Sequence, residues 1–400
     1  MPALRQHNEW RVTAVDLPRV IIVGGGIGGL TAALALQHAG MEPVVLERAK
    51  SVEDLSLGAG VHLWCNALRA LQKIDMADAV AAIGIQMTAH RYLTWQGQSL
   101  GHLRVDTVSA GLGAPTVGVS RPELHRTLVD ALGEKVLRLG AECVGFEQNT
   151  QRVVARLADG DEEQGDVLIG ADGIKSVVRQ ELHGWTEPHY SGLTAWRGIC
   201  DYTDPSIPVG EMCIYWGPGA RILHYHISGQ RLYWLALVKS PPRHKDPDGA
   251  RKAAVTERYR GWPRHIQGMI AATDETAILR TDIVDRDPLK RWGWDRVTLL
   301  GDAAHPMTPD MAQGAGQAIE DGVSVASALQ RATDPVAGLR DYEQRRLERA
   351  NGFVKTSRIV NRMSLMDAPV MCAVRNQLAL RTVYAIQAAG KARKDLTPAL

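Results

Sequence analysis

The sequence has little of several features that mark particular classes of protein. Its five cysteines are dispersed, without a C-x-x-C pair or a neighbouring His cluster, which argues against a structural zinc site and suits reduced thiols. No apolar run reaches the length of a membrane span, and residues 1–19 contain no apolar signal-peptide core. The net charge is only +2, and no run of Lys or Arg suggests a nucleic-acid or acidic-membrane partner. We therefore expect a soluble, cytoplasmic protein without a bound metal.

Phenylalanine is also scarce, with two residues against ten tryptophans. Several Trp and Tyr residues fall between 185 and 262, where their rings either fill a core or form the flat walls of a pocket. The same region has apolar runs at 221–227 and 231–238 joined by a short turn, which is typical of a hairpin. A second hairpin is predicted at 90–103, turning at Gly97. These segments predict an antiparallel sheet.

A glycine-rich turn near the N-terminus predicts a dinucleotide site. The motif G-x-G-x-x-G is formed by Gly24, Gly25, Gly26, Ile27, Gly28 and Gly29. Its glycines allow a tight turn, close approach of a pyrophosphate and close helix–strand contact, and the phosphates would bind at the helix N-terminus. Glu47, at the end of a second buried strand, can accept both ribose hydroxyls and would repel a 2′-phosphate. We therefore predict a β-α-β unit in a parallel sheet that binds FAD or NAD rather than NADP.

Two further motifs follow apolar strands later in the chain. One spans 301–306 and continues at 313–316, where a long helix is predicted to run from about Gln313 to Leu329. Its Asp302 can accept a hydroxyl of a ribityl or ribose chain. The glycine turn can direct N–H groups towards a flavin edge that gains negative charge on reduction. The other motif, at 171–179, reads as a strand end, an Asp-Gly turn and a helix start.

Together, the three motifs resemble those of class A, single-component FAD-dependent monooxygenases with the para-hydroxybenzoate hydroxylase fold, such as salicylate-, urate- and hydroxynicotinate-type hydroxylases. The resemblance covers most of residues 20–363, including 57–71 and 120–124. It implies an α/β fold with a Rossmann-type FAD-binding domain, a β-sheet substrate domain and C-terminal helices. It also implies that NADH or NADPH reduces FAD. Oxygen from O2 is then transferred, through a flavin C4a-hydroperoxide, to a small aromatic or heteroaromatic substrate.

The resemblance also implies domain boundaries and cofactor contacts. The FAD-binding domain would comprise 19–85, 105–186 and 281–335, the substrate domain 86–104 and 187–280, and the C-terminal helices 336–400. The residues implied in FAD binding lie in or beside the motifs: Gly24, Gly26, Gly28, Gly29, Glu47, Arg48, Gly60, Val61, Arg121, Asp172, Asp302, Pro306, Gln313, Gly314 and Ala315. NADH or NADPH would bind transiently without a fold of its own, and the protein would be a monomer or a homodimer.

Strand alternation suggests the residues that contact the substrate. It puts Arg221 and Tyr225 on one face of the predicted strand and His224 on the other, with Arg197 on a neighbouring strand. One of these faces is predicted to supply a cation or phenol that binds the substrate and helps to deprotonate it, so these four residues are the catalytic candidates. The alternative is that His224 is structural and that the two arginines are ordinary surface cations.

The sequence departs from the family pattern at one turn. The usual G-Q-G-x-N reads Ala-Gln-Gly-Ala-Gly at 312–316, so a side-chain amide contact to the flavin is missing. The Trp-Gly-Trp at 292–294 is similar to the W-x-W of flavin halogenases, but it lacks the following Ile-Pro and lies at a different place. Two alternatives stay open. One is epoxidation, or another flavin reaction, on an isoprenoid or natural-product intermediate, and the other is nucleotide binding without catalysis.

Overall fold

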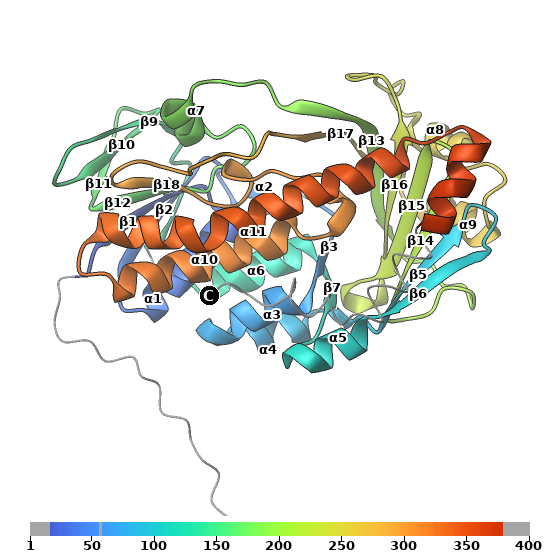
Figure 1. The fold of residues 1–400 in the computed structure, drawn as a ribbon, viewed down its shortest axis with the longest axis horizontal. Coiled ribbons are helices and arrows are strands. Elements are labelled where there is room, and N and C mark those ends of the chain that lie inside the picture. Colours follow the sequence, from blue (N-terminus) through green and yellow to red (C-terminus); the bar gives the residue numbers. More distant parts are fainter. Residues whose placement is uncertain (1–16, 56–57, 134, 379–400) are drawn as a thin grey trace, which may run out of the picture.

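The computed structural model describes residues 17–55, 58–133 and 135–378. Figure 1 shows two large sheets, one at each end of the molecule, with the helix α11 (Pro335–Ser364) extending from the first towards the second. In agreement with this view, α11 contacts strands of both sheets.

The first sheet is parallel and has the order β18-β12-β1-β2-β8. Its strands are β1 (Arg19–Val23), β2 (Glu42–Glu47), β8 (Leu137–Leu139), β12 (Val167–Gly170) and β18 (Val297–Leu299). The apolar run of β1 is buried because helices cover the sheet, among them α1 (Ile27–His38), which packs against α10 (Gly314–Arg331). The predicted β-α-β unit and the long helix that begins in the motif at 313–316 are confirmed.

The second sheet has seven strands in the order β17-β13-β16-β15-β14-β5-β6. They are β5 (Ala89–Thr94), β6 (Ser99–Arg104), β13 (His189–Cys200), β14 (Glu211–Gly217), β15 (Ala220–His226), β16 (Leu232–Lys239) and β17 (Leu279–Asp285). Both predicted hairpins are present, β5–β6 and β15–β16. The sheet is mixed rather than wholly antiparallel, because β14 pairs with β5 in parallel. Its last strand ends at Asp285, beyond the boundary predicted at residue 280.

The two faces of this sheet have different partners. The outer face packs against α8 (Arg251–Arg258) and α9 (Arg264–Ala272), and its core contains four of the large aromatic rings: Trp196, Trp234, Tyr259 and Trp262. On the inner face, Tyr225 and Tyr233 form a cross-strand pair with ring centroids 5.2 Å apart. The aromatic residues of the middle segment therefore fill a core on one side and are available to a cavity on the other.

Smaller elements connect these sheets. Two three-stranded sheets, neither of them predicted from the sequence, are formed by β3 (Gly60–Leu63), β4 (Ile85–Gln86) and β7 (Val117–Ser120), and by β9 (Cys143–Gln148), β10 (Val153–Leu157) and β11 (Glu162–Gly165). The remaining α-helices are α2 (Val52–Leu55), α3 (Cys65–Leu71), α4 (Ala77–Ala82), α5 (Val105–Leu112), α6 (Arg121–Asp130) and α7 (Val177–His183). The pairing of Gly60 with Ser120 brings the start of β3 beside the start of α6.

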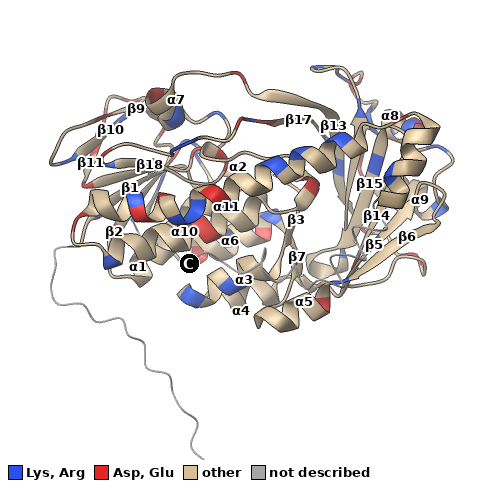
Figure 2. Cartoon of the chain, in the orientation of Figure 1, with Lys and Arg blue, Asp and Glu red and all other residues tan. Residues whose placement is uncertain are grey.

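Basic and acidic residues both occur in each of the two sheet regions (Figure 2). None of the helices in the described ranges is long and apolar enough to span a bilayer. Of the helical segment predicted at 336–400, residues 379–400 lie outside the described residues.

Candidate functional site

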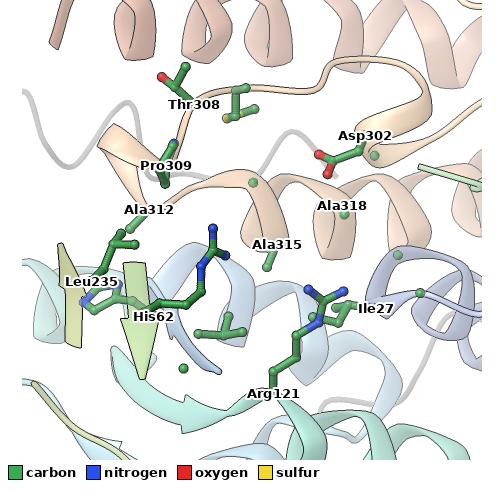
Figure 3. Close-up of a pocket in the computed structure, with 18 of the residues that line it drawn as sticks. Ile27, His62, Arg121, Leu235, Asp302, Thr308, Pro309, Ala312, Ala315 and Ala318 are labelled. Carbon is green, nitrogen blue, oxygen red and sulfur yellow. The ribbon is translucent and has the colours of Figure 1, made fainter. Parts of the chain in front are cut away.

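A cavity of about 380 Å³ lies where the carboxyl ends of the parallel strands face the inner side of the seven-stranded sheet. In the close-up of Figure 3, Ile27, Asp302 and Ala318 lie towards one end of it, and His62 and Leu235 lie towards the other. The three sequence motifs and the sheet therefore contribute to one space, as expected for a crevice outside the strand ends of a parallel sheet.

The glycines of the first motif differ in the space around their Cα atoms. A Cβ added to Gly24 would lie 2.5 Å from the carbonyl oxygen of Ala171, and one added to Gly29 would lie 2.0 Å from that of Gly24. A Cβ on Gly28 would lie 2.6 Å from Leu300, whereas one on Gly26 would meet nothing within 4 Å. Backbone contacts therefore require glycine at Gly24 and Gly29, whereas at Gly28 the end of the Leu300 side chain would have to move. Gly26 leaves an open cradle at the N-terminus of α1, where an anion is favoured.

Glu47 supports this cradle from the end of β2. Its carboxylate accepts hydrogen bonds from the backbone N–H groups of Gly25, at 2.6 Å, and Ala49, at 2.8 Å. It therefore fixes the glycine turn, although Glu47 itself is buried and does not line the cavity. Arg48, the next residue, is exposed and does not line the cavity.

Two ionisable groups in the cavity have unused hydrogen-bonding capacity. The Nε atom of Arg121 is buried and has no partner among the described residues, and burial lowers the pKa of this guanidinium despite the nearby Asp302. Asp302 lines the cavity and is exposed there. The surrounding protein raises its pKa, an effect that His305 and Arg121 partly offset. A cation and a carboxylate that line one cavity and have no partner among the described residues are suited to the phosphate and hydroxyl groups of a dinucleotide.

The other predicted cofactor residues divide into three groups. Gly60, Val61, Gly314 and Ala315 line the cavity. Pro306 and Gln313 are buried behind its wall, and Gln313 accepts a hydrogen bond from Asn66 at 3.1 Å. Asp172 instead caps α7, since its Oδ2 atom accepts the N–H of Val177 at 2.7 Å.

A buried charged network lies behind the second motif. Asp321 of α10 accepts the backbone N–H of Gly301 at 3.0 Å and lies 2.6 Å from Nε2 of His305. Arg346 of α11 donates to Asp321 at 2.7 Å and also pairs with Glu320. Burial raises the pKa of Asp321, but His305 and Arg346 outweigh this effect and lower it to about 2. The network therefore connects α11 to the turn that carries Asp302.

The four predicted catalytic residues lie in three different places. Arg197 and Tyr225 line the cavity. Arg221 does not line it. Its buried guanidinium donates to Asp310 at 2.7 Å and lies over the ring of Trp216. His224 lies on the opposite face of the sheet, next to Tyr215 and His265, because side chains alternate along β15. The structure therefore separates His224 from this site.

A family model described as an FAD binding domain matches residues 18–357. The chain belongs to this family. The aurachin C monooxygenase/isomerase of Stigmatella aurantiaca is 38% identical, with 94% of this chain and 97% of that protein covered. The chloroplastic zeaxanthin epoxidase of Oryza sativa subsp. japonica is 35% identical over 88% of this chain, which spans 56% of that enzyme. Among solved structures, HpxO of Klebsiella pneumoniae complexed with FAD and uric acid has a TM-score of 0.88 and 27% identity, covering 95% of this chain and 97% of HpxO.

The protein is therefore an FAD-dependent monooxygenase, and the predicted fold class and family resemblance are confirmed. The open cradle at Gly26 and the unpartnered groups of Arg121 and Asp302 fit FAD.

Sequence reasoning missed several residues that line the cavity of this monooxygenase. They belong to the loop after the second motif, to the sheet and to β3: Met307, Thr308, Met212, Tyr233, Leu235 and His62. The alternation of β16 could have found Tyr233 and Leu235, which pair with Tyr225 and Leu223. His62 follows Val61 in a segment already assigned to the cofactor, but nothing in its spacing indicates that it faces the sheet.

Buried neutral histidines give the monooxygenase a specific sensitivity to acid. Burial lowers the pKa values of His90 and His224 to about 3, so an unfolded chain binds protons below about pH 6.5 that the folded chain does not. We therefore expect the free energy of unfolding to fall as the pH drops from about 6.5 to 3. Each of these residues would contribute about 1.4 kcal/mol per pH unit.

Urea unfolding at a series of pH values would measure this slope. In His224→Leu, the change in unfolding free energy with pH should be smaller than in the parent protein by about 1.4 kcal/mol per pH unit, the contribution of one histidine. The control is His244→Gln, because this side chain is exposed and forms no ion pair with the described residues, and the slope should then stay at the parental value. Parallel pH curves for His224→Leu and the parent protein would contradict the assignment.

Proposed function

We propose that this monooxygenase oxidises NADH or NADPH and inserts one atom of O2 into a small aromatic or heteroaromatic substrate. The observation that carries the proposal is the composition of the cavity wall formed by the seven-stranded sheet. It combines two tyrosines and aliphatic side chains with one arginine: Met212, Leu223, Leu235, Tyr225, Tyr233 and Arg197. A flat apolar surface suits a planar ring, and a cation at its edge suits an anionic or strongly polar substituent.

FAD, when bound, would supply the chemistry that activates O2, and the protein would contribute binding, orientation and exclusion of water. The phosphates would occupy the cradle at Gly26, with Arg121 as a further cationic partner. Glu47 would accept the ribose hydroxyls, and Asp302 would accept a hydroxyl of the ribityl chain. Gly60 and Val61 of β3 would lie beside the flavin ring, on the side of the cavity that faces the sheet.

Arg197 is the residue of the sheet best placed to orient a polar substrate. One of its terminal nitrogens donates to Thr281 at 2.5 Å, which holds the guanidinium, while its Nε atom is buried and has no partner in the described part of the chain. A substituent with a free lone pair, such as a carboxylate or a ring carbonyl, would satisfy that nitrogen. The guanidinium would then fix which ring carbon faces the flavin.

Epoxidation is the second candidate. It is favoured by the 35% identity to a zeaxanthin epoxidase and by the aliphatic side chains on the sheet side of the cavity. Hydroxylation and epoxidation place the same demand on FAD and O2, so the product distinguishes them.

The experiment that tests the proposal is anaerobic reduction of the bound FAD by NADH and by NADPH. It would be run alone and with a panel of phenols, N–H heteroaromatic compounds and isoprenoid alkenes, followed by product analysis in air. We expect one of the ring compounds to accelerate reduction and to gain one oxygen atom. The variant Arg197→Met should lose the response to anionic compounds more than to neutral ones. Oxygenation of an alkene alone would favour epoxidation, and no oxygenated product with any compound would contradict the proposal.

A further inference from the structure

Two buried histidines meet at the edge of the cavity. His62 of β3 lines the cavity, and its Nε2 atom lies 3.0 Å from the Nε2 atom of His90 on β5. His90 is paired with Met212 of β14, so its side chain points to the same face of the sheet as a residue of the cavity wall. Trp64 and Tyr225 contact the ring of His62 edge-on, with centroids 5.1 and 5.8 Å away. The rings of His62 and His90 are therefore held in a fixed arrangement.

Both rings are neutral near pH 7. Burial holds the pKa of His62 well below its usual value, with a further contribution from His90, and burial lowers the pKa of His90 to about 3. In a neutral pair joined through Nε2, one ring donates its N–H and the other accepts. When His62 is the donor, its Nδ1 atom is a base. That atom is buried and has no hydrogen-bond partner among the described residues, which is rare for a polar atom in a protein interior.

The other ionisable residues around the cavity are not suited to accept a proton from a substrate. Arg121 and Arg197 have guanidinium groups, which donate hydrogen bonds but do not accept them. Burial raises the pKa values of Tyr225 and Tyr233. The carboxylate of Asp302 lies towards the other end, by the start of α1 and the motif that would hold FAD (Figure 3). Within the described part of the chain, His62 is thus the base on the side of the cavity that faces the sheet.

We propose that His62 is the general base of the oxygenation step and that His90 is its proton acceptor. The proposal rests on the proposed function and narrows its substrate class to rings that carry an acidic O–H or N–H. The substrate O–H or N–H bond breaks and leaves its electron pair on the substrate, while an N–H bond forms at Nδ1 of His62. The proton on Nε2 of His62 passes to Nε2 of His90. No oxidant or reductant is needed for this transfer.

A weakly basic imidazole is sufficient for this role. Positive charge develops on the ring as its carbon accepts oxygen, and the attached hydroxyl or N–H becomes far more acidic than in the free substrate. A base that is neutral beforehand leaves the resting site uncharged and takes the proton only when the reaction makes it available. His90 disperses the resulting charge away from the cavity.

The variant His62→Gln preserves a side chain that can hydrogen-bond to His90 but removes the base. We expect it to bind FAD and to be reduced by NADH or NADPH at the parental rate. It should insert oxygen about 100-fold more slowly or worse, because general bases contribute roughly that much or more. His90→Gln should show a smaller loss of the same step. The matched control is His265→Gln, since His265 is also buried and paired but lies on the outer face of the sheet, 2.9 Å from the Tyr215 hydroxyl. It should oxygenate normally.

Two measurements distinguish a failure of this proposal from a failure of the proposed function. The first uses the ring compound that yields product in the reduction panel, with uric acid as the first probe. Reduction and oxygen insertion are timed separately for each variant. Parental oxygen insertion by His62→Gln would overturn the base role alone, whereas failure of the parent enzyme to oxygenate any compound would overturn both proposals.

The second measurement needs no substrate. In the FAD-loaded enzyme labelled with ¹⁵N-histidine, His62→Gln should shift the ring nitrogen resonances of His90 and leave those of His265 in place. Unchanged His90 resonances would show that the two rings are not paired, and the proposed transfer between them would be excluded.

Discussion

Replacing Arg346 with methionine is expected to destabilise the protein by about 3–5 kcal/mol, the usual cost of removing one partner from a buried ion pair. Arg346 is fully buried, and its guanidinium contacts the carboxylates of Glu320 and Asp321 and the side-chain oxygen of Gln317. Methionine fills a similar volume but supplies no charge. The carboxylates of α10 would lose their principal cation in a space that water does not reach.

The loss should also reach the cofactor site. Asp321 holds the backbone N–H of Gly301 and contacts His305, so a displaced Asp321 moves the turn that presents Asp302 to the cavity. We expect Arg346→Met to unfold at lower urea concentration and to retain less FAD after gel filtration. The matched control is Arg345→Met, one residue earlier on the same helix. Arg345 is partly exposed and pairs with Asp341 on the surface, where such pairs contribute about 0–1 kcal/mol. Equal urea midpoints for the two variants would contradict the role of the network.

This network illustrates what the sequence could and could not predict. Gly301, Asp302 and His305 belong to a local motif, and a strand followed by a glycine turn and a helix is encoded within about thirty residues. Arg346, the cation shared by Glu320 and Asp321, lies 26 and 25 residues from them, on the following helix, which also supplies Arg349 to Glu320. Helical periodicity predicts that helix, but nothing local distinguishes Arg346, which is buried, from Arg345, which is not.

The same limit applies to the substrate side. The hairpins could be predicted because apolar runs and turn residues are adjacent in the chain. Strand alternation then gave two possible faces for β15, and sequence alone could not choose between them. The choice depends on α8 and α9, which cover the face that carries His224. The His62–His90 pair is harder still, because it joins strands of two different sheets.

Replacing Gly26 with alanine is expected to weaken FAD binding while leaving the fold intact. A Cβ at this position meets no protein atom within 4 Å, and the backbone φ of −68° is open to any residue. Gly26→Ala should therefore fold, at a cost of no more than about 1 kcal/mol for a less favourable residue at the start of α1. The added methyl group would occupy the cradle proposed for the pyrophosphate. Overpacking of this kind costs about 1–3 kcal/mol, so FAD should bind about 10–100-fold more weakly.

Titration of the apo-protein with FAD, followed by flavin fluorescence, gives the affinity, and circular dichroism of the same apo-protein gives its melting temperature. Two glycines serve as comparisons. At Gly352, on the exposed side of α11, an added Cβ also meets nothing, so Gly352→Ala should change neither fold nor affinity. At Gly29 the added Cβ would lie 2.0 Å from a backbone oxygen, so Gly29→Ala should lower the melting temperature even without FAD. If Gly26→Ala bound FAD as tightly as the parent, the phosphates could not lie in this cradle. If it melted like Gly29→Ala, Gly26 would be required by the fold rather than by the cofactor.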